Sequence, residues 1–479
     1  MNDRNKIMQD IKDDFEEIEY LCLNYLKVFK KHVIQIKENK SHIQPDVADK
    51  TITDCYGKIK EIEGEVKKLE SVRNDYASFT GRKKKVRALL RYWAVFAGGL
   101  TISADWQSPG FVHSLISEAG RQTGKIKGTI NDYKRDVHLD EKEFEEMFLK
   151  EYVTAKNKYF LKSYLTNSGQ AAFQTILTYF LSENKLKGKV LVGKSSYFQY
   201  KQILAGTYGR NLIEAEETDT KGVLDRVEDD SISAIFLDSL CNSATISVPD
   251  LETIISYLNK NIKHNLYLII DNTCLSVFCQ PFNLKKNRKI HLLTFESLNK
   301  YYQFGLDRVT AGIIVCENKD AGGIFEYRKH AGTNITDSSV YALPRPKRKI
   351  LAKRIERHQR NAMKLAEYLS QVIPGRAGES KIKKIIYPGQ GSFLNIRFKQ
   401  KYNTPGVMIK FLNTVISTAK KQNVNIIGGT SFGLNTTRIY LTAIWSKYSA
   451  PFLRISAGTE DILEVNKICE VFAEAIRRY

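Results

Sequence analysis

Apolar residues recur at alternating three- and four-residue steps through the first eighty positions of the chain. One series runs from Met8 to Ile36, and a second runs from Ile52 to Tyr76. This spacing is typical of helices that pack on one another along a seam. The stretch "KSHIQPD" separates the two series, and its final residue, Asp46, suits the cap of the second helix. The pattern predicts a helical hairpin over residues 1–80 that packs on its own body or on a partner subunit.

From about Tyr164 onward, short apolar runs alternate with amphipathic segments. The runs "GKVLVGKSS", "ISAIFLDSL" and "NLYLIIDNT" predict buried strands, and "DLETIISYLNKNI" predicts one of the helices between strands. Alternation of this kind is typical of a mostly parallel sheet that is covered by helices on both faces. We therefore expect an α/β domain over residues 161–340, preceded by an arm or linker over residues 81–160.

A different pattern follows "PRPKRK". The stretch "RKILAKRIERHQRNAMKLAEYLSQV" predicts one long helix, and "GQGSFLNIRFK" and "TTRIYLTAI" predict strands. The final stretch, "TEDILEVNKICEVFAEAIRRY", predicts a closing amphipathic helix. These elements indicate a smaller α+β domain over residues 341–479.

Composition narrows the class of protein. A chain of 479 residues with 42% hydrophobic residues is long enough for two or more domains with real cores. The charged N-terminus does not resemble a signal peptide, and the most apolar run, from Tyr92, is too short to cross a bilayer. Seven scattered cysteines without a C-x-x-C pair indicate reduced thiols and no metal site. We expect a cytoplasmic protein with no membrane contact.

The net charge of +21 raises the question of an acidic partner. Basic clusters lie at "GRKKKVRALLR" and "PRPKRKILAKR", where apolar residues at helical spacing interrupt them. No nucleic-acid-binding motif accompanies them. We therefore interpret the charge as a lysine-rich surface and expect no nucleic-acid partner.

Candidate chemistry lies at the predicted ends of strands, where open α/β sheets bind their ligands. Ser168, Gly169 and Gln170 begin a helix, and a helix N-terminus suits a phosphate. Asp271 ends a very apolar strand, where it either pairs with a cation or caps the next segment. Lys300 follows another apolar stretch and suits amine chemistry. A phosphate cradle, an acid and a lysine in this order are what pyridoxal phosphate needs.

The motifs "TNSGQAA", "IDNT", "SLNKYYQFGLD" and "LRISAGTEDI" occur in this order along the chain. They resemble motifs of the cysteine/methionine-metabolism family of pyridoxal-phosphate enzymes, which includes cystathionine γ-synthase, cystathionine lyases and methionine γ-lyase. The resemblance covers roughly residues 133–479. It implies the fold-type I transferase fold, with a mostly parallel seven-stranded sheet and a C-terminal α+β domain, to which the helical hairpin is an addition.

The resemblance also implies roles for residues that would contact the cofactor. Lys300 would be the Schiff-base lysine and Asp271 the partner of the pyridine nitrogen, whereas Asn242 would lie near the phenolic oxygen. The phosphate would be held by one group of residues, namely Ser168, Gly169, Gln170, Ser297 and Asn299, together with Tyr133 and Arg135 from the neighbouring subunit.

Three further residues would serve the substrate. Arg454 would clamp the substrate α-carboxylate, and Ser431 would line the same site. Tyr197 would stack on the cofactor ring and serve catalysis, because a phenol on a cationic ring would have a lowered pKa.

The sequence departs from the family pattern at two loops. Both prolines of the family's E-x-P-x-N-P stretch are replaced, by Leu240 and Ser243. The glycines of its Y-G-G-T stretch are replaced by Phe198 and Gln199, so that loop must be rebuilt. These departures predict a divergent relative.

The resemblance implies an enzyme of amino-acid metabolism of the trans-sulfuration type. Its substrate would be an amino acid with a leaving group at Cβ or Cγ, which is eliminated or replaced through a Lys300 Schiff base. The resemblance implies a homo-oligomer, either a dimer or a homotetramer built as a dimer of dimers. An aminotransferase-like enzyme and a catalytically weak scaffold that binds a partner through its helical extension remain alternatives. The sequence leaves open the substrate side chain and the role of residues 1–80.

Overall fold

The computed structural model describes residues 3–38, 45–104, 136, 139–156, 158–228, 231–373, 380–444 and 450–478. The chain divides into two compact units. Unit 1 comprises Met1–Ile7, Phe180–Glu296 and Leu351–Tyr479, and unit 2 comprises Met8–Tyr179 and Ser297–Ile350. Among the described helices, none is both long enough and apolar enough to span a membrane.

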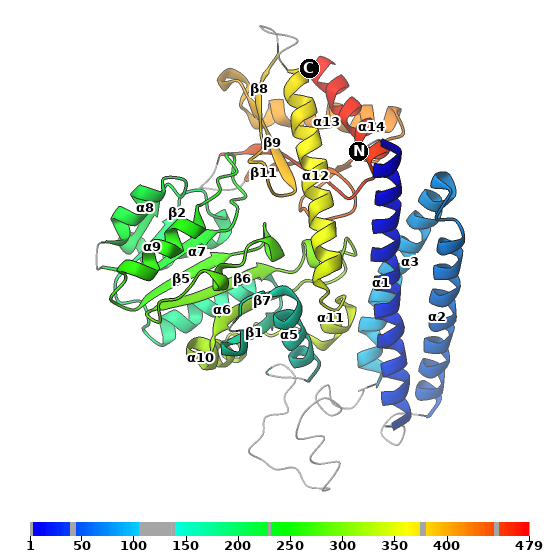
Figure 1. The fold of residues 1–479 in the computed structure, drawn as a ribbon, viewed down its shortest axis with the longest axis horizontal. Helices are drawn as coiled ribbons and strands as arrows, with labels where there is room; N and C mark the ends of the chain where they lie inside the picture. Colours follow the sequence, from blue (N-terminus) through cyan, green and yellow to red (C-terminus); the bar gives the residue numbers. More distant parts are fainter. Residues whose placement is uncertain are drawn as a thin grey trace. The chain divides into compact units, whose positions relative to one another are not determined.

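The helices are shown in Figure 1, and the first four precede all the strands. They are α1 (Asp3–Glu38), α2 (Pro45–Ser71), α3 (Tyr76–Ala104), α5 (Leu139–Tyr152), α6 (Gly169–Ser182), α7 (Phe198–Tyr208), α8 (Thr220–Val227), α9 (Leu251–Asn261), α10 (Asn318–His330), α11 (Asp337–Ala342), α12 (Arg348–Val372), α13 (Pro405–Lys421) and α14 (Ile462–Arg478).

The larger sheet has seven strands in the order β1-β7-β6-β5-β4-β2-β3. Its strands are β1 (Leu161–Thr166), β2 (Lys189–Gly193), β3 (Leu212–Ala215), β4 (Ile232–Asp238), β5 (Leu266–Asp271), β6 (Ile290–Ser297) and β7 (Gly312–Glu317). The pairs from β3 through β2, β4 and β5 to β6 are parallel, and β1 is antiparallel to β7. The predicted mostly parallel sheet is confirmed. Buried Ile and Leu side chains of β4 and β5 pack against α8 and α9, which explains the apolar runs in the sequence.

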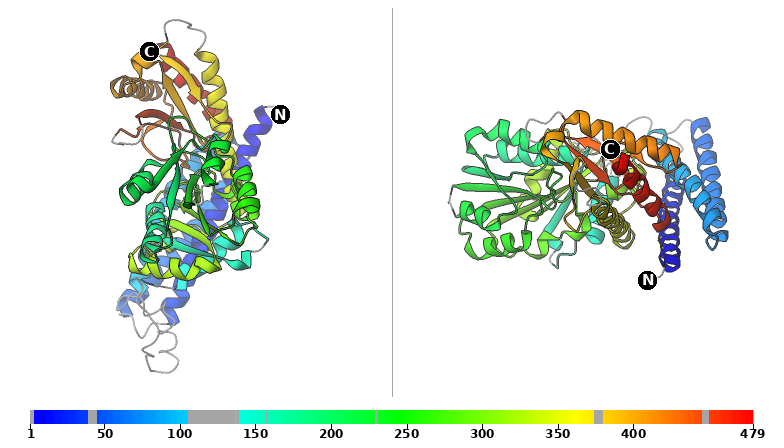
Figure 2. Two further views of the ribbon diagram at one scale, coloured as in Figure 1. Left: turned by 90° about the vertical axis from the view of Figure 1, so that its left-hand side faces the viewer. Right: turned by 90° about the horizontal axis from the view of Figure 1, so that it is seen from above.

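The C-terminal part of unit 1 holds a five-stranded sheet in the order β10-β11-β12-β9-β8. Its strands are β8 (Ile382–Ile386), β9 (Phe393–Phe398), β10 (Ile427–Gly428), β11 (Arg438–Thr442) and β12 (Phe452–Ser456). Helices α12, α13 and α14 contribute the apolar side of their surfaces to one core with this sheet. Figure 2 shows the same elements from two further directions. The predicted smaller α+β arrangement at the C-terminus is present.

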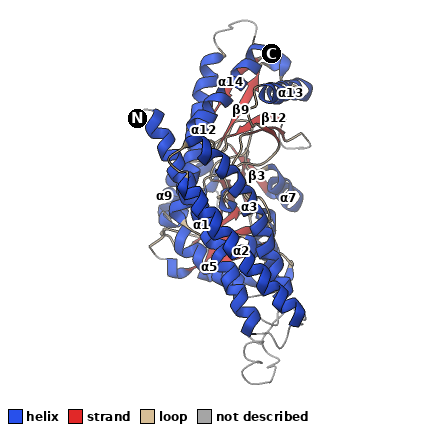
Figure 3. Cartoon of the chain, turned by 90° about the vertical axis from the view of Figure 1, so that its right-hand side faces the viewer, coloured by secondary structure: helices blue, strands red, loops and turns tan. Residues whose placement is uncertain are grey.

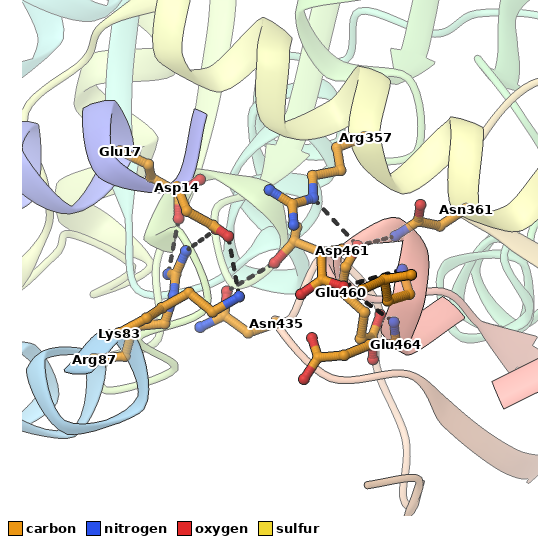
Figure 4. A network of polar contacts seen from close by, with 12 residues as sticks. Asp14, Glu17, Lys83, Arg87, Arg357, Asn361, Asn435, Glu460, Asp461 and Glu464 are labelled. Atoms are coloured by element: carbon orange, nitrogen blue, oxygen red, sulfur yellow. Dashed lines mark hydrogen bonds and ion pairs between the residues drawn. The ribbon is translucent and has the colours of Figure 1, made fainter. Parts of the chain in front are cut away.

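The N-terminal helices α1, α2 and α3 lie along one another (Figure 3). The two helices of the predicted hairpin are present, and the basic cluster after Gly81 lies on the third. Lys83 and Arg87 of α3 pair with Asp14 of α1 over 3.0 and 3.1 Å, and Arg87 also pairs with Glu17 (Figure 4). Buried charges are stable only when paired, so part of the basic cluster serves to hold the helices together.

Within unit 2, the N-terminal helices pack on α11 and on the segment that follows it. The Tyr25 hydroxyl donates to the carbonyl of Ala342 over 2.8 Å, and the Asn24 side-chain oxygen accepts from the backbone N–H of Arg345 over 3.1 Å. A Cβ atom added to Gly98 would lie 2.7 Å from the carbonyl oxygen of Ser338. Within this unit, the helices are therefore built into the body of the structure through contacts that need specific residues.

Candidate active site

In unit 2, the start of α6 meets the end of β6. The Ser168 hydroxyl accepts a hydrogen bond from the backbone N–H of Ala171 over 3.0 Å, as an N-cap residue does. A Cβ atom added to Gly169 would lie 2.8 Å from the Cβ of Ser297, so this close approach requires glycine. The structure thus brings together Ser168, Gly169, Gln170 and Ser297 at the positive end of a helix.

Lys300 follows β6 by three residues and precedes a short 3₁₀ turn, Tyr301–Gln303. Its side chain is half-buried. The Asn299 side-chain oxygen accepts from the backbone N–H of Ala311 over 2.8 Å. Because the oxygen of the Asn299 amide accepts this bond, its nitrogen is the group that can donate. The predicted role of Asn299 as a hydrogen-bond donor to phosphate needs that nitrogen.

A residue that the sequence analysis missed fixes the loop after Lys300. The buried Gln303 accepts from the backbone N–H of Arg308 over 2.9 Å and donates to the carbonyl of Val309 over 2.7 Å. Phe304 has a positive φ of 51°, which is uncommon for a bulky residue. The Gln303 amide therefore adds side-chain hydrogen bonds to the backbone bonds that this tight loop forms. The only signal in the sequence was a polar residue inside an apolar stretch.

In unit 1, two carboxylates end neighbouring parallel strands. Asp238 of β4 is the register partner of Asp271 of β5. Asp271 accepts from the backbone N–H of Thr273 over 3.0 Å, so it begins a local turn, as the capping alternative proposed. This bond leaves the cofactor role open, because a carboxylate has two oxygens with several lone pairs. Asp238 was not predicted as a site residue.

Arg454 of β12 is held from two directions. It donates to the side-chain oxygen of Asn242 over 2.8 Å and to the carbonyl of Ser431 over 3.4 Å. The rings of Phe393 and Phe432 lie 5.5 and 6.0 Å from its guanidinium carbon. The structure thus brings together three predicted residues of unit 1 and adds two aromatic rings that the sequence analysis missed. A guanidinium that is 3% exposed and stacked on rings is well prepared to bind a carboxylate.

Tyr197 is the N-cap residue of α7, and its hydroxyl donates to the side-chain oxygen of Gln199 over 2.9 Å. Burial, followed by the nearby Asp271 carboxylate, raises the pKa of Tyr197 to about 12, although Arg454 acts in the opposite direction. The sequence predicts a lowered pKa for this phenol when it lies on a cationic ring. Burial decides this direction, so the hydroxyl keeps its proton at neutral pH, and a lowered pKa on the cofactor ring stays a prediction.

The loop after β4, which carries Asn242, contains a strained residue and is held by hydrogen bonds from β9. Its residue Ile246 has a φ of 52°, a strained conformation for a β-branched side chain. The buried Asn395 of β9 donates to the carbonyls of Ser243 and Ala244 over 2.8 and 3.2 Å. Hydrogen bonds from the terminal sheet therefore hold a loop that lacks both prolines of the family pattern.

Helix α12 fixes the turn that follows β12. Asn361 donates to the carbonyls of Gly458 and Glu460 over 3.0 and 2.9 Å, and Arg357 donates to the carbonyl of Glu460 over 3.3 Å (Figure 4). The neighbouring Arg354 donates to the carbonyl of Gly433 over 2.9 Å. Buried polar residues of one helix thus satisfy backbone groups on both sides of the predicted carboxylate site.

Two predicted residues, Tyr133 and Arg135, lie outside the described residues. Among the residues that the structure does describe, no group of His, Cys, Asp and Glu side chains is arranged to hold a metal ion.

Comparison with known proteins identifies the family. Residues 105–434 match the family described as Cys/Met metabolism PLP-dependent enzyme. The chain belongs to this family. It is 24% identical over 360 residues to the bifunctional enzyme flvA of Aspergillus flavus, an alignment that covers 73% of this chain and 43% of that protein. It is also 24% identical over 316 residues to cystathionine gamma-synthase of Haemophilus influenzae, covering 64% of this chain and 78% of that enzyme. The chain thus spans less than half the length of flvA.

Solved structures share the fold. The chain matches metB from Corynebacterium glutamicum with a TM-score of 0.58 and 19% identity, over 74% of this chain and 89% of that one. It matches cystathionine gamma-lyase from Lactobacillus plantarum with a TM-score of 0.57 and 18% identity, over 74% and 91%. The predicted fold-type I architecture and the predicted family are confirmed. At these identities the structural likeness concerns the fold alone.

The residues present fit the cofactor of this family. The family is PLP-dependent, and the cofactor carries a phosphate, a ring nitrogen and an aldehyde. The collision that a Cβ at Gly169 would make with Ser297 marks a cradle in unit 2 where backbone N–H groups and a serine meet. Such a cradle suits a phosphate. Lys300 supplies an amine three residues beyond Ser297, and Asp271 of unit 1 supplies a carboxylate.

Proposed function

We propose that the protein is a pyridoxal-phosphate-dependent enzyme that acts on an α-amino acid with a leaving group at Cβ or Cγ, by elimination or replacement. The observation that supports this most is the geometry of Arg454. Its guanidinium is buried, bonded to Asn242 and Ser431 and flanked by two rings. A guanidinium held in this way recognises a carboxylate with a fixed orientation.

When bound, the cofactor would supply an electron sink for the carbanion at the substrate Cα. Lys300 would hold the cofactor through its amine and then move the proton of the substrate Cα. Asp271 would keep a proton on the ring nitrogen. The phosphate would be held at the start of α6 by Ser168, Gly169 and Gln170, with Ser297 and Asn299.

The remaining residues would act on the substrate. Arg454 and Ser431 would orient the α-carboxylate and thereby fix the direction of the Cα–H bond. Tyr197 would carry a proton to or from the leaving group. Because burial raises the pKa of Tyr197 to about 12, its hydroxyl carries a proton at neutral pH. Asn242 would contact the cofactor's phenolic oxygen through its amide nitrogen, since its oxygen accepts from Arg454.

The proposed assembly is at least a dimer. Tyr133 and Arg135 match family residues that reach the phosphate of a neighbouring subunit, and in that case the complete site needs two chains. A tetramer of two such dimers is the larger form of the same proposal.

One observation favours a second candidate. The hydroxyl of Tyr197 is bonded to Gln199, which occupies a glycine position of the family pattern. A phenol engaged in this way is less available at Cβ or Cγ. Chemistry that ends at Cα, as in an aminotransferase-like enzyme, would not need it.

The experiment is a panel of amino acids with leaving groups at Cβ or Cγ, incubated with the purified protein and pyridoxal phosphate. We expect a 2-oxo acid and ammonia, or a new amino acid when a thiol or carbon nucleophile is added. Lys300→Ala should abolish both the visible absorbance of bound cofactor and turnover, whereas Lys319→Ala, at the exposed start of α10, should change neither. Turnover retained in Lys300→Ala would reject the proposal. Amino-group transfer to a 2-oxo acid without loss of the side chain would favour the second candidate.

A further inference from the structure

Two departures from the family pattern meet in unit 1. Asp238 stands where E-x-P-x-N-P has its glutamate, and Tyr200 stands where Y-G-G-T has its threonine. In the structure the Tyr200 hydroxyl forms a hydrogen bond with one carboxyl oxygen of Asp238. Both side chains are buried, at 1% and 3% exposure. In this chain a shorter acid than the family's glutamate therefore pairs with a longer hydroxyl-bearing side chain than the family's threonine.

The same carboxyl group holds the backbone at Tyr197. The other oxygen of Asp238 accepts the backbone N–H of Tyr197 over 3.0 Å. Tyr197 is the N-cap of α7, and its own side chain makes no capping bond. The N–H group of an N-cap residue has no partner within its helix, and in a capping box the third helical residue supplies one. Here Asp238 of β4 accepts the hydrogen bond from this N–H group instead. The third helical residue, Tyr200, forms its hydrogen bond with Asp238.

We propose that Asp238 and Tyr200 are positioning residues that act as one unit to fix Tyr197 at the start of α7. The two glycines of the family loop are replaced by larger residues, so backbone flexibility cannot shape the loop as it does in the family pattern. The bond from β4 to the first residue of the helix fixes it from outside. This inference rests on the proposed function only in giving Tyr197 a role at the cofactor and substrate.

The surroundings of the pair support this role. Tyr200 packs edge-on against Phe295 of β6, with ring centroids 5.9 Å apart, and lies 6.5 Å from the ring of Phe236 of β4. Two aromatic side chains therefore hold the ring of Tyr200 while its hydroxyl reaches Asp238. Burial, followed by the Asp271 carboxylate, raises the pKa of Asp238 well above its ordinary value. A carboxyl group that retains its proton can bind both partners without adding a second negative charge beside Asp271.

The test compares Tyr200→Thr, Asp238→Glu and the double variant, which restores the family pair. The first readout is amide hydrogen exchange of the apoprotein in the peptide that contains Tyr197. Each single variant should speed this exchange roughly tenfold, because it breaks one buried hydrogen bond, and the double variant should return most of the protection. Tyr208→Phe, at the other end of α7, is the matched control and should leave the exchange unchanged.

The second readout is the ratio of kcat for product formation to the rate of Cα–H exchange, measured in the enzyme with bound pyridoxal phosphate. The single variants should lower product formation more than Cα–H exchange into deuterium oxide, since a displaced Tyr197 affects the leaving group and not the lysine. Two outcomes would overturn the inference. One is a loss of amide protection in the double variant that equals the sum of the two single losses. The other is a Tyr200→Phe variant, which lacks only the hydroxyl, whose amide exchange changes no more than that of Tyr208→Phe. An inactive wild-type protein would count against the proposed function, whereas amide exchange would still test the pair.

Discussion

The guanidinium of Arg454 donates to the side-chain oxygen of Asn242 over 2.8 Å, although the two residues lie 212 positions apart in the chain. Arg454 sits on a strand of the terminal sheet, and Asn242 sits on the loop after β4. Asn395, the register partner of Arg454 in β9, holds the backbone of the same loop. Two neighbouring residues of the terminal sheet thus fix one loop of the larger sheet within unit 1.

The first prediction concerns Asn395. Asn395→Leu should leave the carbonyls of Ser243 and Ala244 without this donor and allow Arg454 to shift with the loop. The KM for the amino-acid substrate should rise roughly tenfold, with a smaller change in kcat, because ground-state and transition-state binding of the carboxylate weaken together. Asn413→Ala, exposed on α13, is the control. Steady-state kinetics would contradict the prediction if KM stayed constant while kcat fell.

The second prediction separates the two roles of Asp271. Asp271→Asn should keep the local turn to Thr273, because an amide oxygen also accepts a backbone N–H. It should nevertheless weaken cofactor binding by roughly tenfold or more, since the neutral side chain cannot hold a proton on the ring nitrogen. Titration of the apoprotein with pyridoxal phosphate, followed by absorbance, measures this.

Asp250 offers a matched control for that experiment. Its side chain accepts from the backbone N–H of Thr253 over 3.0 Å at the start of α9, so it makes the same kind of local bond. Asp250→Asn should change stability by no more than about 1 kcal/mol and leave cofactor binding unchanged. If both variants bound the cofactor like the wild type, Asp271 would be a turn residue and no more.

The third prediction concerns the proton on Tyr197. Tyr197→Phe should retain exchange of the Cα–H into deuterium oxide, while elimination or replacement falls roughly a hundredfold, the ordinary size of a general-acid contribution. Gln199→Ala should act in the opposite direction, because it removes the acceptor that now engages the hydroxyl. Equal loss of exchange and elimination in Tyr197→Phe would indicate that the ring only packs.

The fourth prediction concerns pH and stability. Burial raises the pKa of Glu460 to about 7, although its bonds with Thr437 act in the opposite direction. The ordinary value in the unfolded chain lies near 4.5. Between these two values the folded state holds a proton that the unfolded state has lost. The stability that this group contributes is therefore complete below about pH 4.5 and is lost as the pH rises through about 7.

Melting temperatures between these pH values measure the effect. Glu460→Gln should flatten the decline, which in the wild type amounts to a few kcal/mol in total. Glu252→Gln, exposed at the start of α9, should leave the decline in place. A wild-type protein whose melting temperature rose steadily over the same range would contradict the prediction.

The sequence predicted those features that local pattern determines. Apolar runs revealed the parallel strands, and residues at strand ends, such as Asp271 and Lys300, could be singled out because sheets of this class bind ligands there. Asn395 and Gln303 could not be found in this way. Asn395 is an ordinary polar residue in a strand until the loop 152 positions away lies against it. The pairing of Asp238 with Tyr200 was likewise visible only once the strand and the helix had been brought together.

The last prediction concerns two adjacent glycines of α3. A Cβ at Gly98 would lie 2.7 Å from the carbonyl oxygen of Ser338, whereas a Cβ at Gly99 would meet nothing within 4 Å. Both positions lie inside the helix, so alanine gains about 0.5–1 kcal/mol of helix stability at either one. At Gly98 the collision with the backbone of α11 should outweigh that gain, because a backbone atom cannot move aside as a side chain can.

Gly98→Ala should therefore lower the free energy of unfolding, by about 1–3 kcal/mol, and Gly99→Ala should raise it. Chemical denaturation of the two variants beside the wild type measures both signs. Limited proteolysis should cut the N-terminal helices of Gly98→Ala faster, since their packing on α11 is the contact that the substitution weakens. Equal effects of the two substitutions would mean that α3 does not pack on α11 as described.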